Sequence, residues 1–191
     1  MRVRSIDMND KADAIGILAE AFRDDPIMNW ISDKPGFVRL MFDVTLPVFL
    51  PRGCCYMTEG GEGAAAWLGP GERLKWPFTL VNVFRMLKLI GPLAMIRLAI
   101  SGNKTERLHP EAPHYYLFAI GARRQFQGQG VGTALMKAVL ERCDEARVPA
   151  YLENSREENL KFYLGHGFRV IDEIRFTGHA PTLWIMWRDP R

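Results

Sequence analysis

Three glycines at alternate positions separate an apolar run from a helix-like run in this 191-residue chain. The apolar run covers residues 114–120, and the spacing of apolar residues over 131–146 is typical of a helix. Between the two lie Gly128, Gly130 and Gly132. A strand, a glycine loop and a helix N-terminus in this order favour an anion, because the first-turn N–H groups are unpaired and the helix dipole attracts negative charge. The pattern therefore predicts a site for a phosphate or pyrophosphate group.

The composition limits the class of protein. Hydrophobic residues make up 48% and charged residues 25% of the chain, and the net charge is +3. These values are ordinary for a globular protein and give no reason to expect a nucleic-acid partner. The cysteines are Cys54, Cys55 and Cys143, and their odd number and spacing argue against a disulfide framework or a zinc site. We therefore expect a single domain over 1–191 that is cytoplasmic and holds no metal.

One long apolar segment needs a separate test for membrane insertion. Residues 76–101 are rich in apolar side chains, but Arg85, Lys88 and Arg97 and a Gly91-Pro92 pair interrupt them. No uncharged run reaches the roughly 18 residues that a membrane span requires. The segment therefore predicts two short helices hinged at the Gly-Pro pair, within an insert over about 73–108, and no membrane partner.

The order of the remaining elements indicates a mixed α/β sheet rather than a regular doubly wound one. Helices are predicted after Asp7, over 37–50, over 131–146 and between Ser155 and Gly165. Strands are predicted at 3–6, 54–59, 64–68, 114–120, 148–153, 168–176 and 182–188.

Two short polar stretches indicate how the chain around them is structured. Ser155 and Glu158 have the spacing of a capping box, which predicts Ser155 as the N-cap of the helix that follows. Asp24 and Asp25 lie directly before Pro26. Either they end the first helix as solvated acids, or they bind a cationic amine.

Three known kinds of phosphate-binding loop are candidates here, and the P-loop is excluded. A P-loop needs a lysine before its final hydroxyl residue, and this loop ends in Gly132-Thr133 without one. A dinucleotide site is a stronger rival, because Glu153 ends the next strand where a ribose-binding carboxylate would stand. However, a third glycine is missing at Thr133, and residues 121–127 lengthen the turn that this fold keeps tight.

The third interpretation fits both this loop and a second motif. The spacing from Gln127 through Gly130 to Gly132 resembles the Q/R-x-x-G-x-G/A signature of the GNAT superfamily of N-acetyltransferases. Downstream, Asn159 and Tyr163 are followed by a Gly-Phe pair, which is similar to the second motif of that superfamily. The two motifs also occur in the family's order along the chain.

This resemblance implies a fold, a donor and a class of acceptor. It is specific over about 114–187, the implied acetyl-CoA core, and the run 151–155 resembles a puromycin N-acetyltransferase-like subgroup. The implied GNAT fold is α/β, of the mixed α+β kind, with a mostly antiparallel central sheet of about six or seven strands. Helices cover both faces, and two central strands splay apart. Acetyl-CoA is the implied donor substrate, the acceptor is a primary amine of a small molecule or peptide, and the protein is a monomer or homodimer.

The resemblance also assigns cofactor contacts residue by residue. The strand edge at Phe118, Ala119 and Ile120 is implied to pair with pantetheine and to face the acetyl carbonyl. Asn159 is implied to contact pantetheine as well. The implied pyrophosphate loop consists of Gln127, Gly128, Gln129, Gly130, Val131, Gly132 and Thr133.

Acetyl transfer from a thioester to an amine needs a base for the amine proton and an acid for the departing thiolate. The resemblance implies Tyr163 as the general acid. Two candidates remain open for the base: Glu153, at the strand end beside the splay, and His114, whose imidazole titrates near neutral pH. We expect direct transfer in a ternary complex. A non-catalytic coenzyme A-binding module and a dinucleotide-dependent oxidoreductase are the alternatives.

Overall fold

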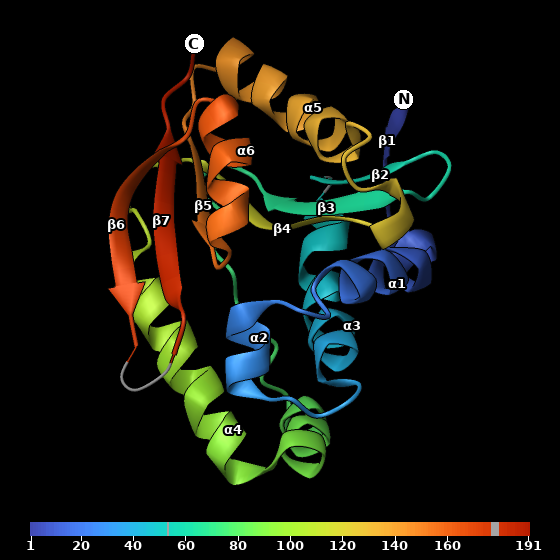
Figure 1. The fold of residues 1–191 in the computed structure, drawn as a ribbon, viewed down its shortest axis with the longest axis vertical. Helices are drawn as coiled ribbons and strands as arrows, with labels where there is room; N and C mark the ends of the chain where they lie inside the picture. Colours follow the sequence, from blue (N-terminus) through green and yellow to red (C-terminus); the bar gives the residue numbers. More distant parts are fainter. Residues whose placement is uncertain (53, 177–179) are drawn as a thin grey trace.

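The computed structural model describes residues 1–52, 54–176 and 180–191, and its seven strands form one sheet in the order β1-β2-β3-β4-β5-β7-β6 (Figure 1). All neighbouring strands are antiparallel except β4 and β5, which run parallel. The predicted mixed, mostly antiparallel sheet is therefore confirmed. The strands are β1 (Val3–Ser5), β2 (Cys55–Thr58), β3 (Gly63–Leu68), β4 (Tyr115–Ala122), β5 (Ala150–Asn154), β6 (Arg169–Arg175) and β7 (Thr182–Arg188).

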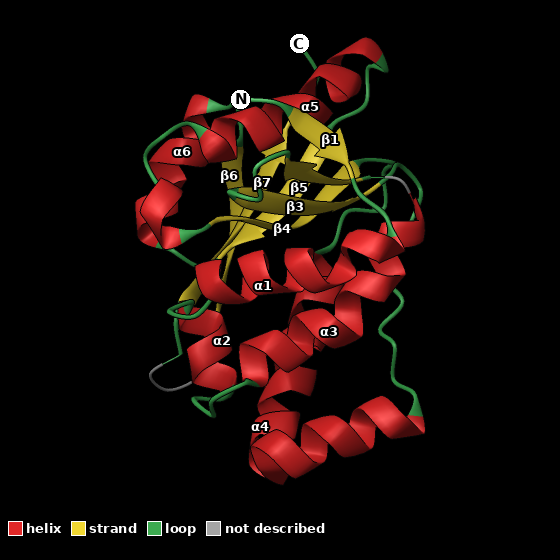
Figure 2. Ribbon diagram, turned by 90° about the vertical axis from the view of Figure 1, so that its right-hand side faces the viewer, coloured by secondary structure: helices red, strands yellow, loops and turns green. Residues whose placement is uncertain are grey.

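Helices cover both faces of this sheet, as predicted (Figure 2). One side carries α1 (Lys11–Ala21), α2 (Pro26–Ile31), α3 (Phe37–Phe49) and α4 (Leu80–Leu108), and the other carries α5 (Val131–Glu145) and α6 (Leu160–Gly165). Short 3-10 turns cover Met8–Asp10, Leu50–Arg52, Arg124–Phe126 and Glu157–Asn159.

The two parallel strands at the centre of the sheet separate along their length. They pair only where Tyr115–Leu117 faces Ala150–Leu152. Beyond that point β4 remains paired with β3 as far as Ala122, and β5 remains paired with β7 as far as Asn154. The edge of β4 after Leu117 therefore has no strand partner on the side of β5 among the described residues, which confirms the predicted splay.

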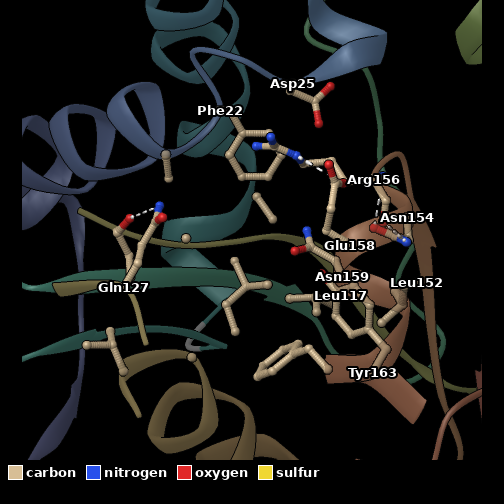
Figure 3. Close-up of a pocket in the computed structure, with 18 of the residues that line it drawn as sticks. Phe22, Asp25, Leu117, Gln127, Leu152, Asn154, Arg156, Glu158, Asn159 and Tyr163 are labelled. Carbon is tan, nitrogen blue, oxygen red and sulfur yellow. Dashed lines mark hydrogen bonds and ion pairs between the residues drawn. The ribbon is translucent and has the colours of Figure 1, made fainter. Parts of the chain in front are cut away.

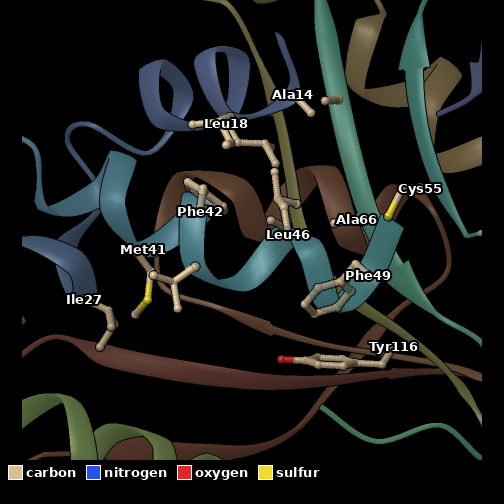
Figure 4. Close-up of a cluster of buried hydrophobic side chains, with 14 of the residues drawn as sticks. Ala14, Leu18, Ile27, Met41, Phe42, Leu46, Phe49, Cys55, Ala66 and Tyr116 are labelled. Atoms are coloured by element: carbon tan, nitrogen blue, oxygen red, sulfur yellow. The ribbon is translucent and has the colours of Figure 1, made fainter. Parts of the chain in front are cut away.

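Buried hydrophobic side chains form two clusters, one on each face of the sheet, because successive side chains of a strand point to opposite faces. Ala64, Ala66 and Leu68 of β3 pack into the cluster beneath α1 and α3, part of which is drawn in Figure 4. Ala65 and Trp67 point the opposite way, into the cluster beneath α5. Successive side chains of a strand face opposite sides of a sheet, so both faces of β3 are buried.

A close approach of α1 to the sheet brings the end of this helix over the splay. A Cβ atom placed on Gly121 of β4 would lie 2.4 Å from Cβ of Ala21. Such a separation is too short for two carbon atoms, so the absence of a side chain at Gly121 allows the helix to pack here. The residue after Ala21, Phe22, consequently lies beside the opening between β4 and β5.

The predicted insert forms one long helical element at an end of the molecule (Figures 1 and 2). Its backbone kinks at Gly91, whose φ of 75° and ψ of 173° are not helical, and Pro92 follows. This confirms the predicted hinge, because proline cannot continue the hydrogen-bond ladder and glycine tolerates a positive φ. Within the described ranges, no helix has both the length and the hydropathy needed to cross a bilayer.

One short helix was not part of the sequence prediction. Pro26 is the first residue of α2 rather than the break that ends a helix, and Asp25 is the N-cap whose side chain accepts from the N–H of Met28. Proline is favoured at this position because the first N–H of a helix is unpaired in any case. The chain therefore turns from α1 into α2 directly above the splay.

Candidate active site

A cavity of about 650 Å³ runs along the splay between β4 and β5 (Figure 3). The glycine loop and the start of α5 form one part of its wall, and α6 forms another. The end of α1 and the N-cap of α2 close the opposite side with Phe22 and Asp25. One space therefore connects the predicted donor loop to a surface built by the N-terminal helices.

The strand edge lies in the wall as the sequence analysis predicts. Phe118, Ala119 and Ile120 line the cavity along the part of β4 that, within the described ranges, has no partner strand on that side. Their backbone groups are available for a ligand that adds along the edge, in the manner of an additional strand. The opposite wall is formed by residues from the end of β5, among them Leu152.

Two glycines of the loop adopt a conformation that favours glycine. Gly128 has a φ of 75° and Gly130, the N-cap of α5, has a φ of 82°. The loop can therefore bring its backbone close to a ligand at the point where the first-turn N–H groups of α5 lack helical partners. The predicted loop residues that line the cavity are Gln127, Gly128, Gly130, Val131, Gly132 and Thr133.

Gln129 differs from the other predicted loop residues. It is not in the cavity wall, and its side-chain amide donates to the carbonyl of Gln125 at 2.9 Å. Two arginines before the loop hydrogen-bond to Glu20 of α1. The side chain of Arg123 donates to the Glu20 carboxylate at 2.9 Å. The backbone N–H of Arg124 donates to the same carboxylate at 3.0 Å.

The second motif brings its two named residues to the cavity. Asn159, the N-cap of α6, and Tyr163 within α6 both line it. Burial, and after it the negative charge of Asp25, raises the pKa of the Tyr163 phenol. The hydroxyl therefore stays protonated at neutral pH and can act as a proton donor.

The two predicted bases lie in a buried polar cluster on the α4 side of the sheet. Glu153 lines the cavity, whereas His114 is not among the described residues that do. The hydroxyl of Tyr151 donates to the Glu153 carboxylate at 2.9 Å. His109 connects the two candidates, with Nδ1 4.0 Å from Glu153 Oε1 and Nε2 3.1 Å from Nε2 of His114. Burial lowers the pKa of His114, which favours its neutral form.

The predicted capping box at Ser155 is wrong. The 3-10 turn that precedes α6 is capped by Arg156 and has no side-chain cap hydrogen bond. The hydroxyl of Ser155 instead donates to Oδ2 of Asp25, which lies across the cavity on the loop between α1 and α2. Asp25 is only 4% exposed, so it is not a solvated acid.

Comparison with known proteins identifies the family. Residues 74–168 match the family model described as Acetyltransferase (GNAT) family. The chain belongs to the GNAT family of acetyltransferases. Membership of this family makes the protein an acyltransferase, as the sequence motifs predict.

Relatives of this GNAT protein match along its whole length. An uncharacterized N-acetyltransferase of Schizosaccharomyces pombe is 24% identical over 207 aligned positions, covering 100% of this chain and 84% of the relative. A Corynebacterium glutamicum structure described as histone acetyltransferase HPA2 and related acetyltransferase superposes with a TM-score of 0.74 at 22% identity, covering 99% and 96% of the two chains. Arylalkylamine N-acetyltransferase 2 from Aedes aegypti has a TM-score of 0.68 at 14% identity, covering 100% and 99%. The fold is therefore shared from the first helices to the last strand.

Proposed function

We propose that this protein moves an acetyl group from acetyl-CoA to a primary amine by direct transfer in a ternary complex. The observation that carries the proposal is a single cavity whose wall contains the glycine loop, the open edge of β4 and Tyr163. A site that holds two substrates together removes much of the entropic barrier to their reaction. No acylated residue of the protein is needed.

The conformation of the loop supports coenzyme A as the carrier of the acetyl group. The backbone N–H groups at Gly130 through Thr133 would hold the pyrophosphate at the N-terminus of α5. The pantetheine arm would lie along Phe118–Ile120, because this edge has unpaired backbone groups on the cavity side. Asn159 would contact the arm from α6.

Tyr163 is proposed as the general acid that protonates the departing thiolate. Its phenol lines the cavity and its raised pKa keeps the proton in place until the thiolate forms. Glu153 and His114 remain predictions for the base. Of these two, Glu153 has the more direct position, because it lines the cavity itself, whereas His114 connects to it through His109 and Glu153.

The acceptor is proposed to be the amine of a small molecule. The Aedes aegypti protein of the same fold is named for arylalkylamines, and the cavity of this chain is closed over the acceptor side by Phe22 and Asp25. A concave cavity of this kind suits a small molecule better than a folded protein surface.

Thermal denaturation and a thiol-release assay test this function. Coenzyme A and acetyl-CoA should raise the melting temperature, whereas NAD and NADP should not. Addition of 2-phenylethylamine or another primary amine should release free thiol from acetyl-CoA in step with amide formation. Stabilisation by dinucleotides alone would support the oxidoreductase alternative. Binding of acetyl-CoA without amide formation across a panel of amines would leave a coenzyme A-binding module.

A further inference from the structure

A buried carboxylate faces the donor machinery from the acceptor side of the cavity. Asp25 is 4% exposed, yet it lines the cavity together with Phe22 and Tyr163 (Figure 3). Its neighbour Asp24 has a side chain that is 62% exposed. The chain thus directs one of two consecutive acids into the cavity and the other toward solvent.

The contacts of Asp25 hold its carboxylate in a fixed place. Oδ1 accepts from the backbone N–H of Met28 at 2.9 Å. Oδ2 accepts from the hydroxyl of Ser155, which follows β5 directly. The carboxylate is therefore fixed both to α2 and to the end of a strand that forms the splay.

A carboxylate in this position is costly for the folded protein unless a cation joins it. Burial raises the pKa of Asp25, although the hydrogen bonds from Ser155 and Met28 and the charge of Arg156 act in the opposite direction. Arg156 also has its own partner, Glu158, at 3.9 Å. The ionised carboxylate thus retains a capacity to bind a positive charge or a proton.

We propose that Asp25, positioned by Ser155, binds the ammonium group of the acceptor and takes the proton that activates it. This inference rests on the proposed function. It gives the acceptor a chemical class: a cationic primary amine whose apolar body packs against Phe22. A primary alcohol of the same shape lacks the charge that Asp25 recognises.

The step balances in protons and electrons. The ammonium gives one proton to the Asp25 carboxylate, and the freed lone pair forms a C–N bond to the thioester carbonyl carbon. The C–S bond breaks, its electron pair stays on sulfur, and the Tyr163 hydroxyl protonates the thiolate. The second proton lost by nitrogen restores Tyr163, and Asp25 releases its proton to solvent after the product leaves.

Asp25→Asn separates the charge of this residue from its shape. The amide oxygen can still accept from Met28, so the N-cap of α2 is kept. With 2-phenylethylamine as the probe, we expect kcat/KM to fall at least about 100-fold, the usual size of a general-base contribution. The melting-temperature shift caused by acetyl-CoA should be unchanged. Ser155→Ala should give a smaller loss of about 10-fold, because it removes one hydrogen bond to the carboxylate.

Asp24→Asn is the matched control and should keep kcat/KM within about twofold, as surface substitutions do. Calorimetry with the coenzyme A-bound protein should detect 2-phenylethylamine binding in the wild type and not in Asp25→Asn, and 2-phenylethanol should bind neither. If acetyl-CoA binds and the wild type neither binds nor acetylates the amine, the ammonium subsite is wrong. Unchanged turnover in Asp25→Asn would overturn the role of Asp25. If acetyl-CoA itself does not bind, the proposed function fails instead.

Discussion

The hydroxyl of Ser155 donates a hydrogen bond to the carboxylate of Asp25, and the two residues are separated by 130 positions in the sequence. The contact joins the loop after β5 to the turn between α1 and α2. Since β5 forms one side of the splay and the turn lines the cavity there, the bond connects the proposed acceptor surface to the proposed donor cleft. A shift of either element would move the carboxylate relative to Tyr163.

Asp25→Asn is expected to stabilise the protein while it removes activity. Burial raises the folded-state pKa of Asp25 above its ordinary 3.8. The folded state therefore binds this proton more tightly than the unfolded chain, and stability falls as pH rises from about 3.8 through the folded pKa. At pH 7 the neutral amide should increase the free energy of unfolding by about 1 kcal/mol, as substitutions that relieve a strained active site do. Urea denaturation at pH 7 and pH 4 measures this, and the difference should shrink at pH 4.

Tyr163→Phe should lower kcat about 100-fold or more with little change in stability. The ring keeps its edge-to-face contacts with Phe162 and Phe168, at centroid separations of 5.2 and 6.1 Å, while the proton donor is lost. Acetyl-CoA affinity should be retained in an equilibrium titration. Tyr115→Phe makes the same change at a buried site outside the cavity wall, and it should keep wild-type kcat. Equal turnover by the two variants would show that Tyr163 is not the acid.

Gly130→Ala should weaken coenzyme A binding and destabilise the fold. The φ of Gly130 is 82°, and an L-residue there is strained by about 1 kcal/mol. A Cβ atom would also stand where the backbone approaches the pyrophosphate, so we expect the Kd for coenzyme A to rise about 10-fold. Gly165→Ala is the control, because Gly165 has no positive φ and open space around it. Titration calorimetry and thermal melts of both variants measure the two effects.

The geometry of the proposed donor half of the site could be predicted because its sequence signals are local. The loop from Gln127 to Thr133 shows its strand, glycines and helix start within one short stretch, and Tyr163 lies at a fixed distance from Asn159 on the same turn of chain. Both arrangements are the same in the folded protein as in the sequence prediction, because they depend on residues that are close together in the sequence. The hinge at Gly91 was predictable for the same reason.

The acceptor half depends on partners that are distant in sequence. The spacing of Ser155 and Glu158 predicts a capping box, in which the Ser155 oxygen would accept from a backbone N–H. In the folded protein the Ser155 hydroxyl instead donates to Asp25, and the turn has no side-chain cap. His109 gave no signal in the sequence, because it becomes part of the site only when the end of α4 meets Glu153. A local pattern cannot reveal which of several possible partners folding brings near.

Glu153→Gln tests one of the two bases that the sequence analysis leaves open. Its carboxylate already accepts from the hydroxyl of Tyr151, and the amide oxygen of glutamine can keep this bond. Because Asp25 rather than Glu153 is proposed to take the amine proton, we expect kcat/KM to fall only a few-fold, within about 1 kcal/mol of transition-state stabilisation. His114→Gln should behave in the same way. A loss of 100-fold in Glu153→Gln, with little loss in Asp25→Asn, would identify Glu153 as the base.

Asp144→Asn should destabilise the protein more than a substitution in an exposed ion pair, because Arg188 is buried while the side chain of Asp144 is only 29% exposed. Arg188 is 3% exposed and donates two hydrogen bonds to Asp144, at 2.8 and 2.7 Å, which join β7 to α5. Loss of the carboxylate charge leaves the buried guanidinium of Arg188 without its ion-pair partner, at a cost of about 2 kcal/mol, which is less than for a fully buried pair because Asp144 is partly solvated. The exposed pair of Arg169 and Asp189, also 2.8 Å apart, is the matched control. Asp189→Asn should cost less than about 1 kcal/mol.

The pH dependence of the same pair gives an independent measurement. The hydrogen bond from Arg188 is the main cause that lowers the pKa of Asp144 below its ordinary 3.8. The stability that this carboxylate contributes is therefore complete above about pH 3.8 and is lost as pH falls through the lower folded-state pKa. Urea denaturation of the wild type should show this loss as pH falls below about 3.8, and Asp144→Asn should show less of it. Identical acid sensitivity in the two proteins would contradict the assignment of this contribution to Asp144.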